Sequence, residues 1–280
     1  MKVVILCGGL GTRLREETEF RPKPMVPIGN RPILWHIMKF YASFGFKEFV
    51  LCLGYKADVI KEYFFNYQRH SSDMTLRLGD KPEIIYHNKH SEDDWLVTLL
   101  DTGLATQTGG RVRRALAHIP DDQFLLTYGD GLCNVRVPDL IKFHRAQGGL
   151  ATLTAVRPSG RFGELTLEEG AVTSFREKPD TEAGYINGGF FVINKKIGDF
   201  LTDDSTIFEF DALPRVAAAG KLHAYRHDNF WQCMDNPREM DLLNKLCADG
   251  KATWKIWYVI SYLRPPWAIW SVGGTESCGA

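Results

Sequence analysis

The sequence has no excess of charge of either sign. Lysine and arginine total 34, aspartate and glutamate also total 34, and the formal net charge is zero. Proteins that hold nucleic acid mainly through its phosphates usually carry a basic excess, so the balance argues against a nucleic-acid partner. It still allows a local basic site, because a sum over the chain does not report where the charges lie.

Paired cysteine motifs and long apolar runs are also missing. The six cysteines show no C-x-x-C spacing, so zinc ribbons and thioredoxin-like motifs are unsupported. The first apolar run, residues 3–7, is too short for a signal-peptide core. No uninterrupted apolar stretch reaches the roughly 18 residues of a membrane span. We therefore expect a protein of the reducing cytoplasm without a membrane span.

What is present is the pattern of an α/β protein of 280 residues, 44% of them hydrophobic. Apolar runs predict buried strands at 3–7, 48–53, 124–128 and 150–156, and a strand with two glycines at 186–193. Helical spacing and helix boundary signals predict helices over 33–44, 58–67, 138–147 and 237–249. Residues 164–176 are typical of a hairpin. Strand–helix–strand repetition predicts a mostly parallel sheet with helices on both faces.

The strongest motif follows the first strand, where Gly8-Gly9-Leu10-Gly11-Thr12-Arg13 forms a glycine-rich turn. Such turns let the backbone approach a ligand closely and offer amides to phosphate. The dinucleotide fingerprint fails because Leu14 stands where its last glycine belongs. The Gly-Lys-Ser/Thr of a P-loop occurs nowhere. Downstream, Pro22 and Pro24 flank Lys23 and restrict where its ammonium group reaches.

Two aspartates are candidate metal ligands. Asp130 lies between glycines at the carboxyl end of a predicted strand, the edge where open α/β sheets bind ligands. Magnesium is usually held by one or two carboxylates plus substrate phosphates, which suits Asp130. Asp235 is a candidate second carboxylate, but it reads equally well as the N-cap of the helix that starts at Pro237. Thr108-Gly109-Gly110-Arg111 predicts a loop rich in glycine and hydroxyl groups.

As an ordered set, these motifs resemble those of the sugar-1-phosphate nucleotidylyltransferases, from Met1 to about Trp257. The segments are LCGGLGTRL, RPKPMVPIGNRPILWHIM, TGGR, YGDG, RFG, EKP, INGGFF and FWQCMD. The stretch GNRPILWHIM, TGGR and FWQCMD point to the branch that transfers cytidylyl groups to glucose 1-phosphate. The resemblance implies a Rossmann-like fold of the nucleotide-diphospho-sugar transferase type, with residues 1–257 as a single domain.

The resemblance also implies a reaction and its residues. The phosphate of glucose 1-phosphate attacks the α-phosphorus of CTP, giving CDP-glucose and pyrophosphate, the first step toward CDP-dideoxyhexoses of bacterial surface polysaccharide. Arg13, Lys23 and Asp130 are implied as catalytic, and Asp130 and Asp235 as ligands of Mg²⁺. The implied nucleotide contacts are Leu6, Cys7, Gly8, Gly9, Leu10, Gly11, Thr12, Arg13, Lys23, Thr106, Arg111 and Gly129. The implied sugar-phosphate contacts are Gly163, Glu177, Lys178 and Asn187. The family commonly forms homo-oligomers.

Alternatives stay open at this point. Thymidylyl or uridylyl transfer on the same scaffold is the alternative within the enzyme class, and the shape of the base pocket and its hydrogen bonds to the base edge decide between them. A non-catalytic sugar-nucleotide-binding protein is disfavoured, because the charged residues of catalysis are all present. Residues 258–280 extend past the usual end of the family. Arg264 and Pro265-Pro266 interrupt them, so they cannot span a membrane as one helix. This atypical tail is a packing arm, an interfacial anchor or an artefact of the reading frame.

Overall fold

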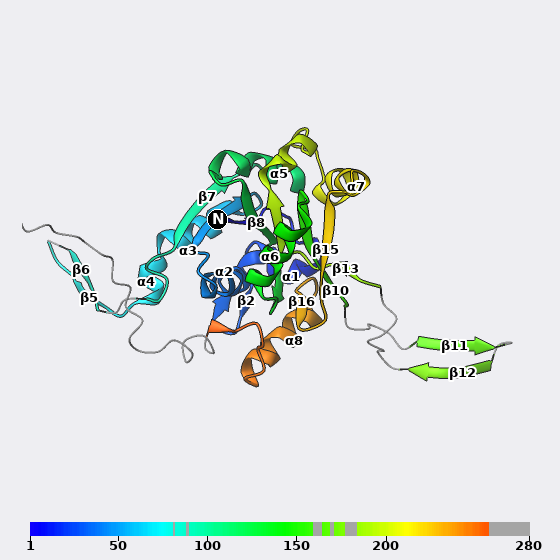
Figure 1. Ribbon diagram of the computed structural model, residues 1–280. Coiled ribbons are helices and arrows are strands. Elements are labelled where there is room, and N and C mark those ends of the chain that lie inside the picture. The colour runs from blue at the N-terminus through cyan, green and yellow to red at the C-terminus, as the bar shows by residue number, and fades with distance from the viewer. Residues whose placement is uncertain (81, 88–89, 159–163, 169–170, 177–183, 258–280) are drawn as a thin grey trace, which may run out of the picture.

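An eight-stranded mixed sheet forms the centre of the protein (Figure 1). The computed structural model describes residues 1–80, 82–87, 90–158, 164–168, 171–176 and 184–257. In spatial order the sheet consists of β13 (Ile186–Asn187), β10 (Ala151–Val156), β14 (Phe191–Asn194), β8 (Gln123–Tyr128), β1 (Val3–Leu6), β4 (Glu48–Leu53) and β7 (Leu96–Asp101), and β15 (Leu222–His227) pairs with β10. Strands β8, β1, β4 and β7 are parallel neighbours, whereas β14 runs antiparallel to β8 and β10. This confirms the predicted mostly parallel, mixed sheet.

Strand β1 is buried on both faces. Val3 and Ile5 belong to one apolar core, and Val4 and Leu6 to a second core on the opposite face. Because strand side chains alternate in direction, a strand covered on both faces reads as a continuous apolar run. The run at 3–7 therefore predicted its strand correctly.

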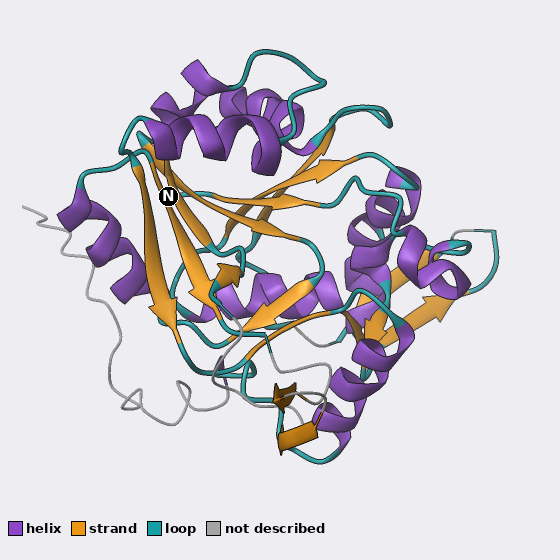
Figure 2. Ribbon diagram, turned by 90° about the vertical axis from the view of Figure 1, so that its right-hand side faces the viewer, coloured by secondary structure: helices purple, strands orange, loops and turns teal. Residues whose placement is uncertain are grey.

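Helices cover both faces of the sheet, as expected (Figure 2). The first core receives side chains from α2 (Ile33–Ser43), α3 (Ala57–Phe65), α6 (Val137–Gln147) and α8 (Pro237–Ala248). The second core receives side chains from α5 (Thr108–Ala115), the π-helix η5 (Phe208–Ala212) and α7 (Leu213–Ala218). Short helical turns complete these layers: η1 (Thr12–Leu14), α1 (Arg15–Thr18), η2 (Lys23–Met25), α4 (Tyr67–Ser71), η3 (Leu116–His118) and η4 (Lys195–Phe200).

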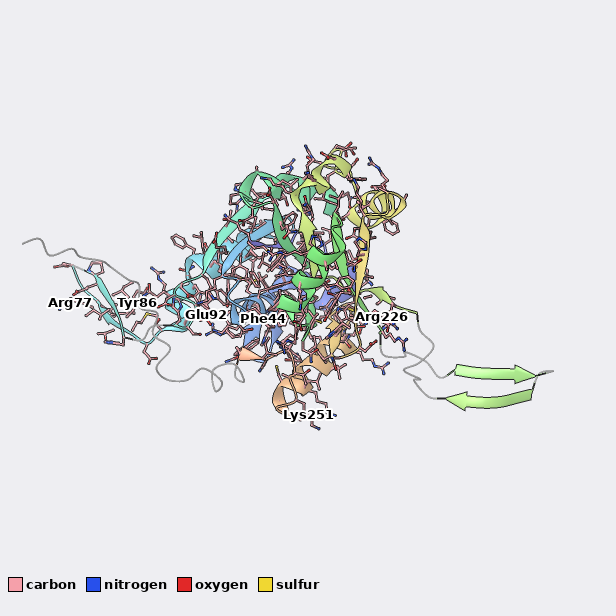
Figure 3. All side chains as sticks on the ribbon, in the orientation of Figure 1. Phe44, Arg77, Tyr86, Glu92, Arg226 and Lys251 are labelled. Carbon is pink, nitrogen blue, oxygen red and sulfur yellow. The ribbon has the colours of Figure 1, made fainter. Side chains whose placement is uncertain are left out.

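Four two-stranded ladders surround the central sheet. They are β2 (Pro27–Ile28) with β3 (Arg31–Pro32), β5 (Met74–Arg77) with β6 (Glu83–Tyr86), β9 (Gly131–Cys133) with β16 (Trp231–Cys233), and β11 (Glu164–Glu168) with β12 (Ala171–Arg176). The predicted hairpin over 164–176 is confirmed in β11 and β12. Hairpin β5–β6, on which Arg77 and Tyr86 are labelled, extends away from the body of the molecule (Figure 3).

Two predicted elements are divided in the structure. The strand expected over 186–193 is split into β13 and β14, because Gly189 and Phe190 have φ angles of 75° and 47°. Left-handed backbone of this kind cannot continue a strand. The helix expected over 58–67 likewise ends at Phe65, and α4 begins two residues later. Among the residues that the structure describes, no helix is long and apolar enough to cross a membrane.

Candidate active site

A buried arginine packs against the glycine-rich turn after β1 and is hydrogen-bonded to its backbone. Arg111 is 4% exposed, and its guanidinium donates to the carbonyls of Leu53 (2.8 Å) and Gly8 (3.2 Å) and to the hydroxyl of Thr102 (2.6 Å). A Cβ at Gly8 would lie 2.2 Å from Arg111 Cζ, and one at Gly54 would lie 2.6 Å from Nη1. Glycine is therefore required at both positions, because the arginine fills the space that a side chain would take.

Arg111 reaches the turn from a helix, and the prediction of a loop at Thr108–Arg111 is wrong. These residues form the first turn of α5. A Cβ at Gly109 would lie 2.8 Å from Thr206 O, and one at Gly110 would lie 2.6 Å from the Cα of Asp204. Close packing against residues 204–206 thus explains both glycines, and it outweighs their poor helix propensity.

Lys23 lies between the two predicted metal ligands. It opens η2, and its Nζ donates to Asp130 Oδ2 (2.7 Å) and also to Asp235 Oδ1. Arg13 Nη1 lies 2.9 Å from Asp235 Oδ2. Burial opposes the charge on Lys23, but the two carboxylates outweigh it and raise the pKa of this lysine. The ammonium group is therefore held charged at the point where both carboxylates meet.

The ladder of β9 and β16 brings Asp235 to Asp130. Gly131, directly after Asp130, pairs with Cys233, and the amide of Met234 donates to the carbonyl of Asp130 (2.9 Å). This antiparallel pairing places two aspartates side by side, although they are far apart in the sequence. Helix α8 then starts immediately after the second of them.

Asp235 is not the N-cap of α8. Asn236 takes that position, and its side chain accepts a hydrogen bond from Glu239 N (3.1 Å). The Glu239 carboxylate reaches back and accepts from Asp235 N (2.6 Å), one residue before the N-cap whose amide it would bind in a standard capping box. The helix start therefore fixes the backbone of Asp235 and leaves its carboxylate directed at Lys23 and Arg13.

Two groups of side chains are candidate cation ligands. Asp130 and Asp235 already stabilise one cation, the Lys23 ammonium, so their donor atoms fit a metal ion. Cys233, Asp235 and Glu239 also bring their ligand atoms within 4.8 Å of one another. Burial, and then the charges of Glu239 and Asp235, raise the pKa of Cys233 to about 12, and a protonated thiol is a poor metal ligand. The aspartate pair is the better fit.

Two neighbouring cavities open at the carboxyl ends of the parallel strands. The glycine-loop cavity, of about 640 Å³, is bounded by the turn after β1, Lys23 and the start of α5. The Asn187 cavity, of about 690 Å³, is bounded by Asn187, Trp231 and Asp235. Arg13, Tyr128 and Asp130 line both cavities. Two ligands bound there would meet at these residues.

The structure brings most of the predicted site residues together. The glycine-loop cavity is lined by every predicted nucleotide contact: Leu6, Cys7, Gly8, Gly9, Leu10, Gly11, Thr12, Arg13, Lys23, Thr106, Arg111 and Gly129. Of the predicted sugar-phosphate contacts, Asn187 lines the second cavity, and Gly163, Glu177 and Lys178 lie outside the described residues.

Sequence reasoning gave no role to three residues around these cavities. Trp231 Nε1 donates to Gly188 O (2.7 Å) in the wall of the Asn187 cavity. Glu239 holds the backbone of Asp235, and its spacing from Asn236 is a capping signal that would have identified it. Glu209 accepts from the hydroxyl of Tyr128, and no motif in the sequence marks it.

Comparisons with known proteins agree with this geometry. The sequence model of the family described as Nucleotidyl transferase matches residues 2–255. Glucose-1-phosphate cytidylyltransferase of Salmonella typhi is 49% identical over 258 residues, covering 92% of this chain and all of that protein. The probable glucose-1-phosphate cytidylyltransferase of Bacillus subtilis is 44% identical over the same coverage.

Solved structures share the fold. HddC from Yersinia pseudotuberculosis superimposes with a TM-score of 0.63 at 25% identity, over 87% of this chain and 98% of that one. A putative glucose-1-phosphate thymidylyltransferase from Bacillus anthracis gives the same TM-score at 16% identity, over 89% and 96% of the two chains. Because the family model matches residues 2–255, the chain belongs to the nucleotidyl transferase family, and its sequence is similar to those of glucose-1-phosphate cytidylyltransferases over 258 residues.

Proposed function

We propose that this protein transfers the cytidylyl group of CTP to glucose 1-phosphate, producing CDP-glucose and pyrophosphate. The observation that carries the proposal is the wall shared by the two cavities, where Arg13, Tyr128 and Asp130 face both. CTP would occupy the glycine-loop cavity, and glucose 1-phosphate the Asn187 cavity. Their reacting phosphates would then meet beside Lys23.

In the reaction, a phosphate oxygen of glucose 1-phosphate forms a bond to the α-phosphorus of CTP, and the bond to the β-phosphate oxygen breaks. Negative charge increases on the oxygens of the departing pyrophosphate. Lys23, charged and held at a defined place, would bind the α-phosphate and the incoming sugar phosphate. Arg13 would neutralise the leaving group. The protein contributes positioning and electrostatic stabilisation, with no covalent intermediate.

Asp130 and Asp235 would hold Mg²⁺, since their carboxylates converge on one cationic group. A bound magnesium ion neutralises phosphate charge and orients the phosphates of the two substrates. Arg13 and Lys23 cancel the charges of the two carboxylates, so the charge of a bound magnesium ion would remain available to the phosphates of the substrates.

The test is release of pyrophosphate from CTP, UTP, dTTP and GTP with glucose 1-phosphate, in Mg²⁺ and after chelation. We expect CTP to be preferred, the activity to require the metal, and Lys23→Ala to lose about 100-fold or more in kcat. Lys142→Ala, at an exposed position on α6, is the matched control and should keep full activity. A clear preference for UTP or dTTP would refute cytidylyl transfer. Absence of pyrophosphate release with all four triphosphates would refute nucleotidyl transfer altogether.

We further propose that the enzyme is a cytoplasmic homo-oligomer whose product supplies CDP-dideoxyhexose formation for surface polysaccharide. Hairpin β5–β6 exposes Leu76, Ile84 and Ile85 away from the body of the molecule, which supports an interface there (Figure 1). An isolated two-stranded hairpin is marginally stable in water, and exposed apolar patches mark interaction sites. Sedimentation should show an oligomer that Ile85→Asp weakens, and a monomeric wild-type protein would contradict the proposal.

A further inference from the structure

One carboxylate connects the walls of the two cavities. Glu209, on the π-helix η5, accepts a hydrogen bond from Tyr128 Oη through Oε1 (2.6 Å) and another from Thr108 Oγ1 through Oε2 (2.6 Å). Tyr128 Oη in turn accepts from Asn187 Nδ2 (3.2 Å). Thr108 lines the glycine-loop cavity and Asn187 the other, whereas Glu209 itself is not among the residues lining either.

The direction of every hydrogen bond in this network is fixed. A carboxylate only accepts, so both hydroxyls must donate to Glu209. Tyr128 Oη lies 2.6 Å from Glu209 Oε1, and its hydroxyl is the only proton donor of that pair. The free lone pairs of Tyr128 Oη can then accept only from the amide nitrogen of Asn187. The amide oxygen of Asn187 faces the opposite way and accepts from Gly189 N (3.0 Å).

The network also holds the start of α5. With its proton directed at Glu209, Thr108 Oγ1 accepts from Phe208 N (2.9 Å), which ties the first turn of the helix to η5. Turns of π-helix are often found at functional sites, and this one carries Glu209, which is hydrogen-bonded to lining residues of both cavities.

We propose that Glu209 is a positioning residue that sets Asn187 and Thr108 for substrate binding in the two cavities. The inference deepens the proposed function and rests on it. Removing the negative charge of Glu209 frees Tyr128 to reverse its hydroxyl, which releases Asn187 from its single orientation. It also frees Thr108 at the wall of the other cavity. Binding of the nucleotide and of the sugar phosphate should therefore both weaken, although Glu209 lines neither cavity.

Three variants separate this role from a purely structural one. Glu209→Gln keeps the shape but introduces a donor, and should raise KM for glucose 1-phosphate and for the nucleotide by about tenfold each, with a smaller change in kcat. Tyr128→Phe removes the hydrogen bonds that its hydroxyl makes with Glu209 and Asn187 but leaves the one between Thr108 and Glu209, so it should raise KM for the sugar phosphate more than KM for the nucleotide. Asp211→Asn, on the same π-helix, removes a carboxylate that accepts from Ile207 N and is the matched control. It should change either KM by less than about twofold.

The measurements use the full chain with whichever triphosphate the wild-type protein turns over fastest. The test of Glu209 therefore does not depend on whether CTP is the preferred nucleotide. Unchanged KM values in folded Glu209→Gln would overturn the positioning role while leaving the proposed function intact. Equal effects of Glu209→Gln and Asp211→Asn would also overturn it, because they would indicate a general disturbance of η5. Wild-type protein without any turnover would overturn both proposals.

Discussion

At the residue scale, the site is a chain of opposite charges in contact. Arg13 binds Asp235, Asp235 binds Lys23, and Lys23 binds Asp130. The net charge of zero conceals this arrangement, because a site for two small polyanions needs a few placed charges and no basic surface. The identity of some neutral residues is also constrained by packing. The glycines that contact Arg111 have no room for a side chain.

Gly8→Ala and Gly9→Ala form a matched pair that tests this constraint. A methyl group at Gly8 would collide with Arg111, which several hydrogen bonds hold in place, whereas nothing lies within 4 Å of a Cβ at Gly9. We expect Gly8→Ala to lower the free energy of unfolding by about 1–3 kcal/mol, and Gly9→Ala by less than about 0.5 kcal/mol. Urea denaturation measures both values. Equal losses would show that Arg111 moves aside without cost.

At the element scale, two short pieces of structure position the carboxylate of Asp235. The β9–β16 ladder sets Asp235 beside Asp130, and the first turn of α8 holds its backbone through Glu239. The start of α8 therefore both caps the helix and orients the site. Asn236 accepts from a free amide of the first turn, and Glu239 holds the backbone of Asp235.

Asn236→Ala tests the link between the helix cap and the site. The substitution removes the acceptor for Glu239 N and should cost about 1 kcal/mol of stability. Because Glu239 also holds Asp235 N, we expect kcat to fall severalfold as well. Asp241→Ala, at an exposed position on the same helix, is the control and should change neither quantity. A loss of stability with unchanged kcat would show that Asp235 keeps its position without the cap.

Helix α2 carries a histidine that makes the fold sensitive to acid. His36 is 2% exposed; its Nδ1 accepts from Trp254 Nε1 (3.4 Å), and its Nε2 then donates to Ile28 O (2.8 Å). Burial lowers the pKa of His36 to about 4 from its ordinary 6.5. Between these values the unfolded chain binds a proton that the folded protein does not, so stability falls as the pH falls.

The loss from His36 should approach about 3 kcal/mol near pH 4 and vanish above about pH 7. We expect His36→Gln, which can still donate to Ile28 O, to lose less stability than the wild type between these pH values. Urea midpoints of both proteins across the range provide the measurement. Parallel curves would mean that other groups cause the acid sensitivity.

At the scale of the whole molecule, the two apolar cores give the sheet its rigidity, and the end of the described chain closes one of them. Trp254 is fully buried and stacks on Phe230 with ring centroids 5.3 Å apart. Trp257 packs edge-on against Trp35 of α2, at 5.7 Å. Every site contact described above is made by residues up to Glu239, so the site depends on this closure only through the core.

Two truncations test where the stable unit ends. A chain ending after Trp257 should keep its thermal midpoint and its turnover, because Trp254 and the whole described sheet remain. A chain ending after Asp249 loses Trp254 and should lose about 3–5 kcal/mol of stability. Thermal unfolding and pyrophosphate release measure both effects. A marked loss of stability or turnover in the chain ending after Trp257 would show that residues 258–280 contribute to the fold or the site.

Much of the fold was predictable, because its signals are local. The runs at 3–7 and 48–53 are continuous since both faces of their strands are covered, and the helix over 33–44 follows from its apolar spacing. Two of the errors lie at glycines. The glycines of Thr108–Arg111 and Gly188–Gly189 look like loop or strand residues until their neighbours are known, and packing against residues 204–206 or a left-handed backbone decides otherwise.

The sequence by itself determined the order of strands and helices, the glycine turn after β1 and the charged residues available for catalysis. These follow from periodicity and turn chemistry, which act over a few residues. Only the tertiary structure decided that Lys23 meets Asp235 across 212 positions, that Arg111 points inward beneath the turn, and that Glu209 joins the two cavity walls. Such contacts depend on the order of strands in the sheet and on which helix covers which face, and no local pattern encodes them.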